Sequence, residues 1–126
     1  MIKVYSYTKI NRPTRQTTDW LTSHNIDFSL ITKNDLTINL IMEMLQVSEN
    51  GFEDILISEN RSKIYKEKKV FSSVERLSTN ELYENILTYP EVLREPIVFS
   101  DNKMVIGYNS EEIRKFLPRF RKEKPC

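Results

Sequence analysis

Residues 93–118, LREPIVFSDNKMVIGYNSEEIRKFLP, contain the clearest structural pattern in the chain. Its segments 97–99 and 104–106 are apolar and rich in residues that favour strands. The loop 100–103 between them contains Ser, Asp and Asn, whose short side chains hydrogen-bond to the nearby backbone in turns. Two strand-like segments joined by a short polar loop predict a β-hairpin.

A short helix is predicted after the hairpin. Asn109 and Glu112 have the three-residue spacing of a capping box. Ile113 and Phe116 would lie on one face of the helix. Pro118 would end the helix, because its ring cannot continue the hydrogen-bond pattern. Residues 93–118 therefore read as strand, turn, strand and capped helix.

The start of the chain predicts a strand, a helix and a second strand. Residues 2–7 contain strand-forming side chains, and Pro13 suits the first turn of a helix. Asn25 is a plausible C-terminal stop for that helix, and the alternating segment 26–32 follows it. A parallel pair of strands with a right-handed crossover is the expected arrangement.

The middle of the chain reads as helical. An apolar stripe follows Thr37, and that helix is expected to end at Asn50–Gly51, where glycine can adopt a positive φ. A short second helix is predicted over 52–56, and Ser78 with Glu81 predicts the start of another.

These elements together predict an α/β fold. We expect a thioredoxin-like core, built as β-α-β followed by β-β-α, with an all-helical insert over about 35–90, between the second and third strands. Residues 1–118 are expected to form a single domain. The basic tail 119–126 is expected to be disordered.

The composition of the chain excludes several kinds of function. The 126 residues carry a net charge of +1, so overall charge does not favour nucleic-acid binding. No apolar segment approaches the length of a membrane span, and no membrane partner is expected. Cys126 is the only cysteine and His24 the only histidine, which leaves too few ligands for a typical metal site. With no internal disulfide, the sequence favours a cytoplasmic protein without a metal or cofactor.

Several short motifs, spread over almost the whole chain, carry a family resemblance. They are Val4-Tyr5-Ser6, Trp20-Leu21, Asn50-Gly51, Arg61-Ser62-Lys63, Leu82-Tyr83, Pro90 with Leu93, Arg94-Glu95-Pro96-Ile97, and Gly107-Tyr108-Asn109 through Pro118-Arg119. Together they resemble the arsenate reductase-like (ArsC) family, and within it the Spx branch of bacterial transcriptional regulators.

The resemblance implies a chemical site that this chain lacks. The family's reductases use a cysteine at the start of the first helix, and Spx-type regulators carry a Cys-x-x-Cys redox switch there. Here Asn11 and Thr14 lie near those two positions, and the loop 7–14 contains no cysteine. The family also places an arginine before a cis-proline to hold an oxyanion, where this chain has Glu95, preceded by Arg94. We therefore expect no catalytic residues, no enzyme activity and no redox sensitivity.

The resemblance also implies a partner. Spx-type regulators bind the C-terminal domain of the RNA polymerase α subunit, and a glycine at that contact matches Gly51. Promoter DNA would be contacted only within the polymerase complex.

The alternative for Gly51 is a simple helix cap, and the alternative for the basic pair Arg61 and Lys63 is a solvated helix face. Near Gly51, the family's regulators carry a basic residue where this chain has Gln46. The expected partner-binding residues are Tyr5, Ser6, Tyr7, Asn11, Arg12, Gly51, Arg61 and Lys63.

Two other functions stay open. One is an arsenate reductase-like oxidoreductase, which the missing cysteine and Glu95 argue against. The other is a catalytically inactive module that binds an anion or a protein partner. Lys9, Arg12 and Arg15 surround the expected start of the first helix, where backbone N–H groups favour anions, although ordinary surface charge is the favoured explanation for them.

Overall fold

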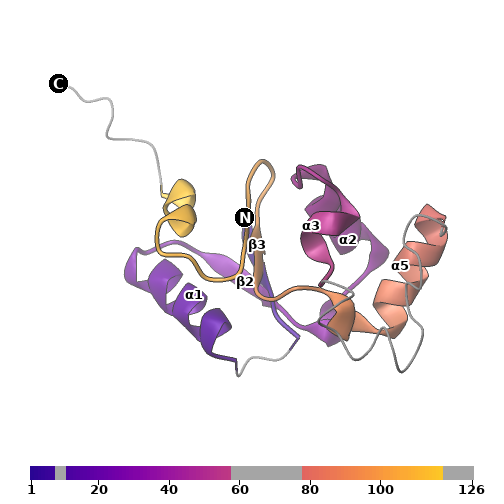
Figure 1. The fold of residues 1–126 in the computed structure, drawn as a ribbon. Helices are drawn as coiled ribbons and strands as arrows, with labels where there is room; N and C mark the ends of the chain where they lie inside the picture. Colours follow the sequence, from indigo (N-terminus) through magenta and orange to yellow (C-terminus); the bar gives the residue numbers. More distant parts are fainter. Residues whose placement is uncertain (8–10, 58–77, 118–126) are drawn as a thin grey trace.

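The computed structural model describes residues 1–7, 11–57 and 78–117, and a four-stranded mixed sheet lies at its centre (Figure 1). The strand order is β2-β1-β3-β4. β1 pairs in parallel with β2 and antiparallel with β3, and β3 pairs antiparallel with β4. The strands are β1 (Ile2–Tyr5), β2 (Phe28–Ile31), β3 (Ile97–Phe99) and β4 (Met104–Ile106).

Helices cover both faces of the sheet. Helix α1 lies on one side, and α2, α3 and α5 lie on the other (Figure 1). The α-helices are α1 (Arg12–Ser23), α2 (Ile38–Gln46), α3 (Phe52–Ile55) and α5 (Thr79–Thr88). Three 3₁₀ helices, η1 (Lys33–Asp35), η4 (Pro90–Val92) and η5 (Glu112–Phe116), complete the described elements. The predicted order of a β-α-β unit, helices, and a β-β unit is confirmed, and the fold is thioredoxin-like.

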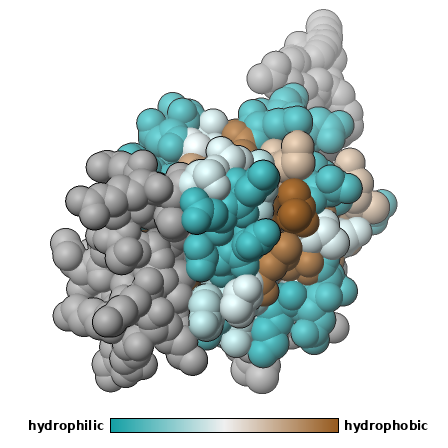
Figure 2. Space-filling view, turned by 90° about the vertical axis from the view of Figure 1, so that its right-hand side faces the viewer, coloured by the Kyte–Doolittle hydropathy of each residue, from teal (hydrophilic) through white to brown (hydrophobic). Residues whose placement is uncertain are grey.

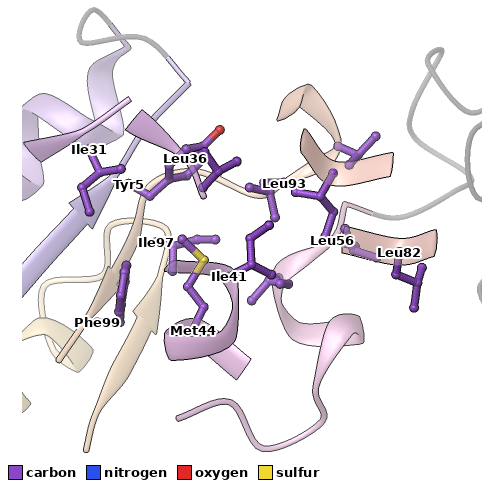
Figure 3. Close-up of a cluster of buried hydrophobic side chains, with 13 residues drawn as sticks. Tyr5, Ile31, Leu36, Ile41, Met44, Leu56, Leu82, Leu93, Ile97 and Phe99 are labelled. Atoms are coloured by element: carbon purple, nitrogen blue, oxygen red, sulfur yellow. The ribbon is translucent and has the colours of Figure 1, made fainter. Parts of the chain in front are cut away.

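The two central strands are buried on both faces, so the core has two halves. Successive strand residues point to opposite faces. Val4 and Val98 therefore pack with Leu21 of α1, while their neighbours Tyr5 and Ile97 pack toward the helices on the other side. Figure 3 shows this second half, in which strand side chains meet residues of α2, α5 and the segments next to α3 and η4.

Local signals fix the ends of two helices, and the Asn25 end of α1 and the Ser78 start of α5 are as predicted. Asn11 caps α1, and its side-chain oxygen accepts a hydrogen bond from the Thr14 N–H at 2.9 Å. At the other end Asn25 adopts a φ of 57°, and the Ile26 N–H bonds back to the Leu21 carbonyl at 2.9 Å. The capping box of α5 forms between Ser78 and Glu81.

The predicted end of α2 was wrong. The helix ends at Gln46, because the Val47 N–H turns back to the Met44 carbonyl in a tighter bond of 3.2 Å. Gly51 does adopt a positive φ of 67°, but it lies directly before α3 rather than at the end of α2. The glycine therefore shapes the turn between the two helices.

The last predicted helix is a 3₁₀ helix. The Asn109 side chain accepts hydrogen bonds from the backbone N–H groups of Glu111 and Glu112, at 2.8 and 2.9 Å. In a capping box the Glu112 carboxylate would accept a hydrogen bond from the Asn109 backbone N–H. It instead contacts Lys115 at 3.3 Å. Ile113 and Phe116 are buried as expected.

Three expectations involve residues outside the described part of the chain. Segment 58–77 and the tail 118–126 lie outside the described residues, so the tail's disorder stays a prediction. The single domain over 1–118 also stays a prediction, as does the extent of the insert over about 35–90.

Helix α2 offers a direct test of which face holds the core. Ile41 is fully buried, whereas Ile38, one turn earlier, is 41% exposed. Ile41→Ala should lower the free energy of unfolding by about 2–5 kcal/mol, because it removes buried methyl groups and leaves a cavity. Ile38→Ala is the matched control and should cost less than ~1 kcal/mol. Urea denaturation followed by circular dichroism measures both, and equal losses would contradict this packing.

Candidate functional site

The pairing of β1 with β3 brings together the loop after β1 and the residue before β3. Tyr5 lies opposite Ile97 in the antiparallel register, so Ser6 and Glu95 continue past the same end of the pair. The Glu95–Pro96 peptide bond is cis, as the resemblance implied. Residues about ninety positions apart in sequence thus meet at the start of α1.

Three donors converge on one oxygen of Glu95. Its Oε1 atom accepts hydrogen bonds from the Ser6 hydroxyl at 2.9 Å, the Tyr7 backbone N–H at 2.8 Å and the Asn11 amide at 3.0 Å. Hydrogen bonds to a charged acceptor are stronger than neutral ones. The carboxylate therefore holds the loop after β1 against the segment that leads into β3.

Further hydrogen bonds fix the donors themselves. The Ser6 hydroxyl accepts from the Asn11 amide at 2.8 Å and from the Thr14 hydroxyl at 2.9 Å. It thus uses one donor and two acceptor positions, the full capacity of a hydroxyl. Ser6 and Thr14 are buried, so water does not compete for these bonds. We call Ser6, Asn11, Thr14 and Glu95 the carboxylate network.

The network occupies the place where the resemblance puts a reactive thiol. Asn11 and Thr14, near the two cysteine positions, bond to each other, to Ser6 or to Glu95. An alcohol needs a neighbouring base to act as a nucleophile. His24 lies at the far end of α1, where its ring stacks on Trp20 with the ring centres 3.9 Å apart. His24 is therefore not placed to activate Thr14, and the absence of enzyme activity stays a prediction.

Two expected contact residues are not on the surface. Tyr5 and Ser6 are both fully buried, so their expected role as direct partner contacts stays a prediction that this burial disfavours. Burial raises the pKa of the Tyr5 hydroxyl, which lies 3.5 Å from the Pro90 carbonyl oxygen. Both side chains continue the strand into the core and do not belong to the exposed loop.

The cations near this site lie on the surface. Lys33 donates a hydrogen bond to the Tyr7 hydroxyl at 3.2 Å and lies 4.4 Å from the centre of its ring. Arg12 and Arg15 are exposed, and Lys9 lies outside the described residues. An anion bound there would meet the Glu95 carboxylate, so anion binding by these cations stays a prediction that the network disfavours.

Gly51 lies in a turn that a second carboxylate holds. Its φ of 67° and ψ of −134° suit glycine, and a Cβ there would have nothing within 4 Å. Asp54 accepts from the Asn50 backbone N–H at 2.8 Å and from the Asn50 amide at 3.2 Å. The backbone bond is the main cause that lowers the pKa of Asp54.

Sequence reasoning missed Asp54. The spacing of four between Asn50 and Asp54 could have indicated its role. At that spacing an acidic residue in the first turn of α3 can accept a hydrogen bond from the backbone N–H of the residue before Gly51. Two predicted contacts on the same insert, Arg61 and Lys63, lie outside the described residues.

Arg94 connects the two regions. Its backbone N–H donates to the Ile55 carbonyl at 2.8 Å, and its Nε donates to the Leu56 carbonyl at 2.8 Å. The residue before Glu95 is thus attached to the end of α3. Since α3 begins after Gly51, the carboxylate network and the Gly51 turn are joined through one short stretch of chain.

Neither a metal-binding cluster nor a membrane-spanning helix lies among the described residues. Residues 1–7, 11–57 and 78–117 contain no group of three or more His, Cys, Asp or Glu side chains placed to hold a metal ion. Within the same ranges, every helix is too short or too polar to cross a membrane.

Comparison with known proteins identifies relatives along most of the chain. The model of the ArsC family matches residues 6–116. The global transcriptional regulator Spx of Lactiplantibacillus plantarum is 40% identical over 108 residues, which is 83% of this chain and 78% of that protein. The Spx protein of Streptococcus pneumoniae is 39% identical over 87% of this chain and 82% of its own length. Spx 2 of Bacillus cereus is 36% identical, over 83% and 79% of the two chains.

Solved structures share the fold at lower identity. A Staphylococcus aureus protein, known from its solution structure, superposes with a TM-score of 0.74 at 16% identity, covering 94% of this chain and all (100%) of that one. An arsenate reductase from Vibrio cholerae gives a TM-score of 0.68 at 17% identity, covering 92% and 94%. At such identities the likeness concerns the fold alone.

Removing the Glu95 carboxylate should destabilise the protein. Glu95→Ala leaves one hydroxyl and two N–H groups without their shared charged acceptor, so the free energy of unfolding should fall by about 1–3 kcal/mol. Glu91→Ala is the control, because Glu91 is also an exposed glutamate close in sequence, and it should cost less than ~0.5 kcal/mol. Urea denaturation compares the two, and similar losses would mean that the network contributes nothing beyond a surface charge.

Proposed function

The chain belongs to the ArsC family, and from that membership we propose that it is a transcriptional regulator of the Spx kind, which binds RNA polymerase through the C-terminal domain of the α subunit. The observation that carries this proposal is the carboxylate network. It occupies the place of a reductase thiol with groups that cannot do thiol chemistry, in a chain 36–40% identical to three proteins named as Spx regulators.

The same observation argues against a reductase. A thiolate is stabilised by nearby cations and by the N-terminus of a helix. Here the helix begins with the Asn11 cap, and the residue before the cis-proline is the anion Glu95. A carboxylate at that position repels both a thiolate and an oxyanion substrate. The arrangement suits a protein that keeps the fold for binding.

The Gly51 turn is the proposed centre of the polymerase contact. A glycine whose Cβ position faces open space lets a partner's backbone or side chain approach the main chain closely. Tyr7, Asn11 and Arg12 would contribute at the start of α1. Arg61 and Lys63 remain in the proposal through their match to the family motif, and promoter DNA would be touched only within the polymerase complex.

We further propose that the regulator does not respond to oxidation. The only cysteine, Cys126, lies far in sequence from the loop where a redox switch would be, and Asn11 and Thr14 replace the switch residues. The amount of protein in the cytoplasm, rather than its oxidation state, would then set its effect.

The polymerase contact can be tested at Gly51 with a matched glycine as control. Gly51 and Gly107 have φ values of 67° and 76°, and both have open space around the Cβ position. The native protein should bind the isolated C-terminal domain of the α subunit, and Gly51→Arg should weaken binding by about tenfold or more, or ~1.4 kcal/mol. Gly107→Arg introduces the same side chain at another position with a positive φ, away from the Gly51 turn, so it should retain binding.

Isothermal titration calorimetry would measure these affinities, with circular dichroism to confirm that both variants fold. An equal loss of affinity in Gly51→Arg and Gly107→Arg would show that the loss comes from backbone strain rather than from an interface. A native protein that fails to bind would remove the proposed function.

Independence from oxidation is tested with diamide and a Cys126→Ser variant. Affinity for the α-subunit domain should stay within about twofold before and after treatment, because no pair of thiols exists to form an internal disulfide. The serine variant controls for dimers linked through Cys126. An oxidative change in affinity that persists in Cys126→Ser would contradict the proposal.

A further inference from the structure

We propose that Asp54 is a positioning residue for the Gly51 turn, holding it in the conformation that a partner meets. The partner in this inference rests on the proposed function. The positioning itself concerns only this chain and can be measured without any partner.

Both oxygens of the Asp54 carboxylate engage the residue before the glycine. One accepts from the Asn50 backbone N–H at 2.8 Å, and the other accepts from the Asn50 side-chain amide at 3.2 Å. The Asp54 backbone N–H in turn donates to the Gly51 carbonyl at 3.0 Å. Asp54 therefore bonds to the chain on both sides of the Gly51 α-carbon.

The turn needs such a restraint because glycine does not supply one. Gly51 has no side chain to pack, and nothing lies within 4 Å of the position that a Cβ would take. Glycine has the largest conformational freedom of any residue, so an unrestrained turn would sample several backbone states. A partner that requires one of those states would then bind less tightly, in proportion to its population.

Asp54 is itself anchored to the core. The next two residues, Ile55 and Leu56, are 0% and 4% exposed. Their carbonyl oxygens accept the two hydrogen bonds from Arg94. Because α3 is a single turn of four residues, these contacts rather than helix propensity hold it in place. The position of the Gly51 turn is thus set by the core, through Asp54.

Charge alone is the competing explanation. Glu49 and Glu53 are exposed carboxylates beside the same turn, so removing any one negative charge could alter binding to a charged partner. Glu53→Ala is therefore the matched control for Asp54→Ala. It removes the same charge from the adjacent position of α3 and leaves both hydrogen bonds to Asn50 in place. Asp54→Glu keeps the charge and an acceptor on a longer side chain.

The experiment measures the turn and the binding separately. Amide ¹H–¹⁵N spectra should show the Asn50 and Gly51 resonances moving in Asp54→Ala and staying in Glu53→Ala. Affinity for the isolated α-subunit domain should fall about fivefold in Asp54→Ala, the net value of one hydrogen bond. It should stay within about twofold in Glu53→Ala, and Asp54→Glu should recover part of the affinity.

Three results would overturn the inference. Unmoved Asn50 and Gly51 resonances in Asp54→Ala would show that the carboxylate does not hold the turn, whatever the binding result. Equal losses of affinity in Asp54→Ala and Glu53→Ala would assign the effect to charge. Moved resonances with unchanged affinity, in a protein that Gly51→Arg disables, would show that the partner does not need the turn held. A native protein that fails to bind would remove the proposed function, and with it the partner, while the spectra still decide the positioning.

Discussion

The antiparallel pairing of β1 with β3 determines both the packing of the core and the position of the carboxylate network. These are the two central strands, and their facing pairs Val4–Val98 and Tyr5–Ile97 fill opposite halves of the core. Because the side-chain period of a strand is two, a slip of one residue would reverse both faces, so burial on both sides fixes the register. The same register sets which residues meet at the end of the pair. It places Ser6, just past β1, within hydrogen-bonding distance of Glu95, just before β3.

That meeting point can serve different chemistry according to the residues that occupy it. The backbone N–H of Tyr7 and the side chains of Ser6 and Asn11 are donors aimed at one place, an arrangement that stabilises an anion. In this chain the anion is the Glu95 carboxylate. The donors are thereby satisfied within the molecule, and a loop that could have been poised for reaction is held in place. The fold is kept, and the carboxylate network occupies the place where the resemblance implies a reactive thiol.

Features governed by near neighbours could be predicted from the sequence, and features governed by long-range pairing could not. The hairpin, the Asn25 helix end and the Ser78 capping box each depend on residues within a few positions, and all three are present. The position of Gly51 was misjudged because a glycine with positive φ serves equally well after one helix or before the next. The three hydrogen bonds to Glu95 could not be predicted, because no pattern among neighbouring residues indicates a bond between residues more than eighty positions apart.

A single residue, Arg94, connects the region of Glu95 with the turn that Asp54 holds. Arg94 bonds through its backbone and its side chain to the carbonyl oxygens at the end of α3, and its neighbour Glu95 bonds to the loop after β1. In a protein with a redox switch in that loop, this stretch would be a short route from the switch to the Gly51 turn. With a carboxylate network in place of the switch, the route has fixed ends, because neither set of hydrogen bonds depends on oxidation. Under the proposed function, the occupancy of the Gly51 turn would be governed by the concentrations of protein and partner and by their affinity.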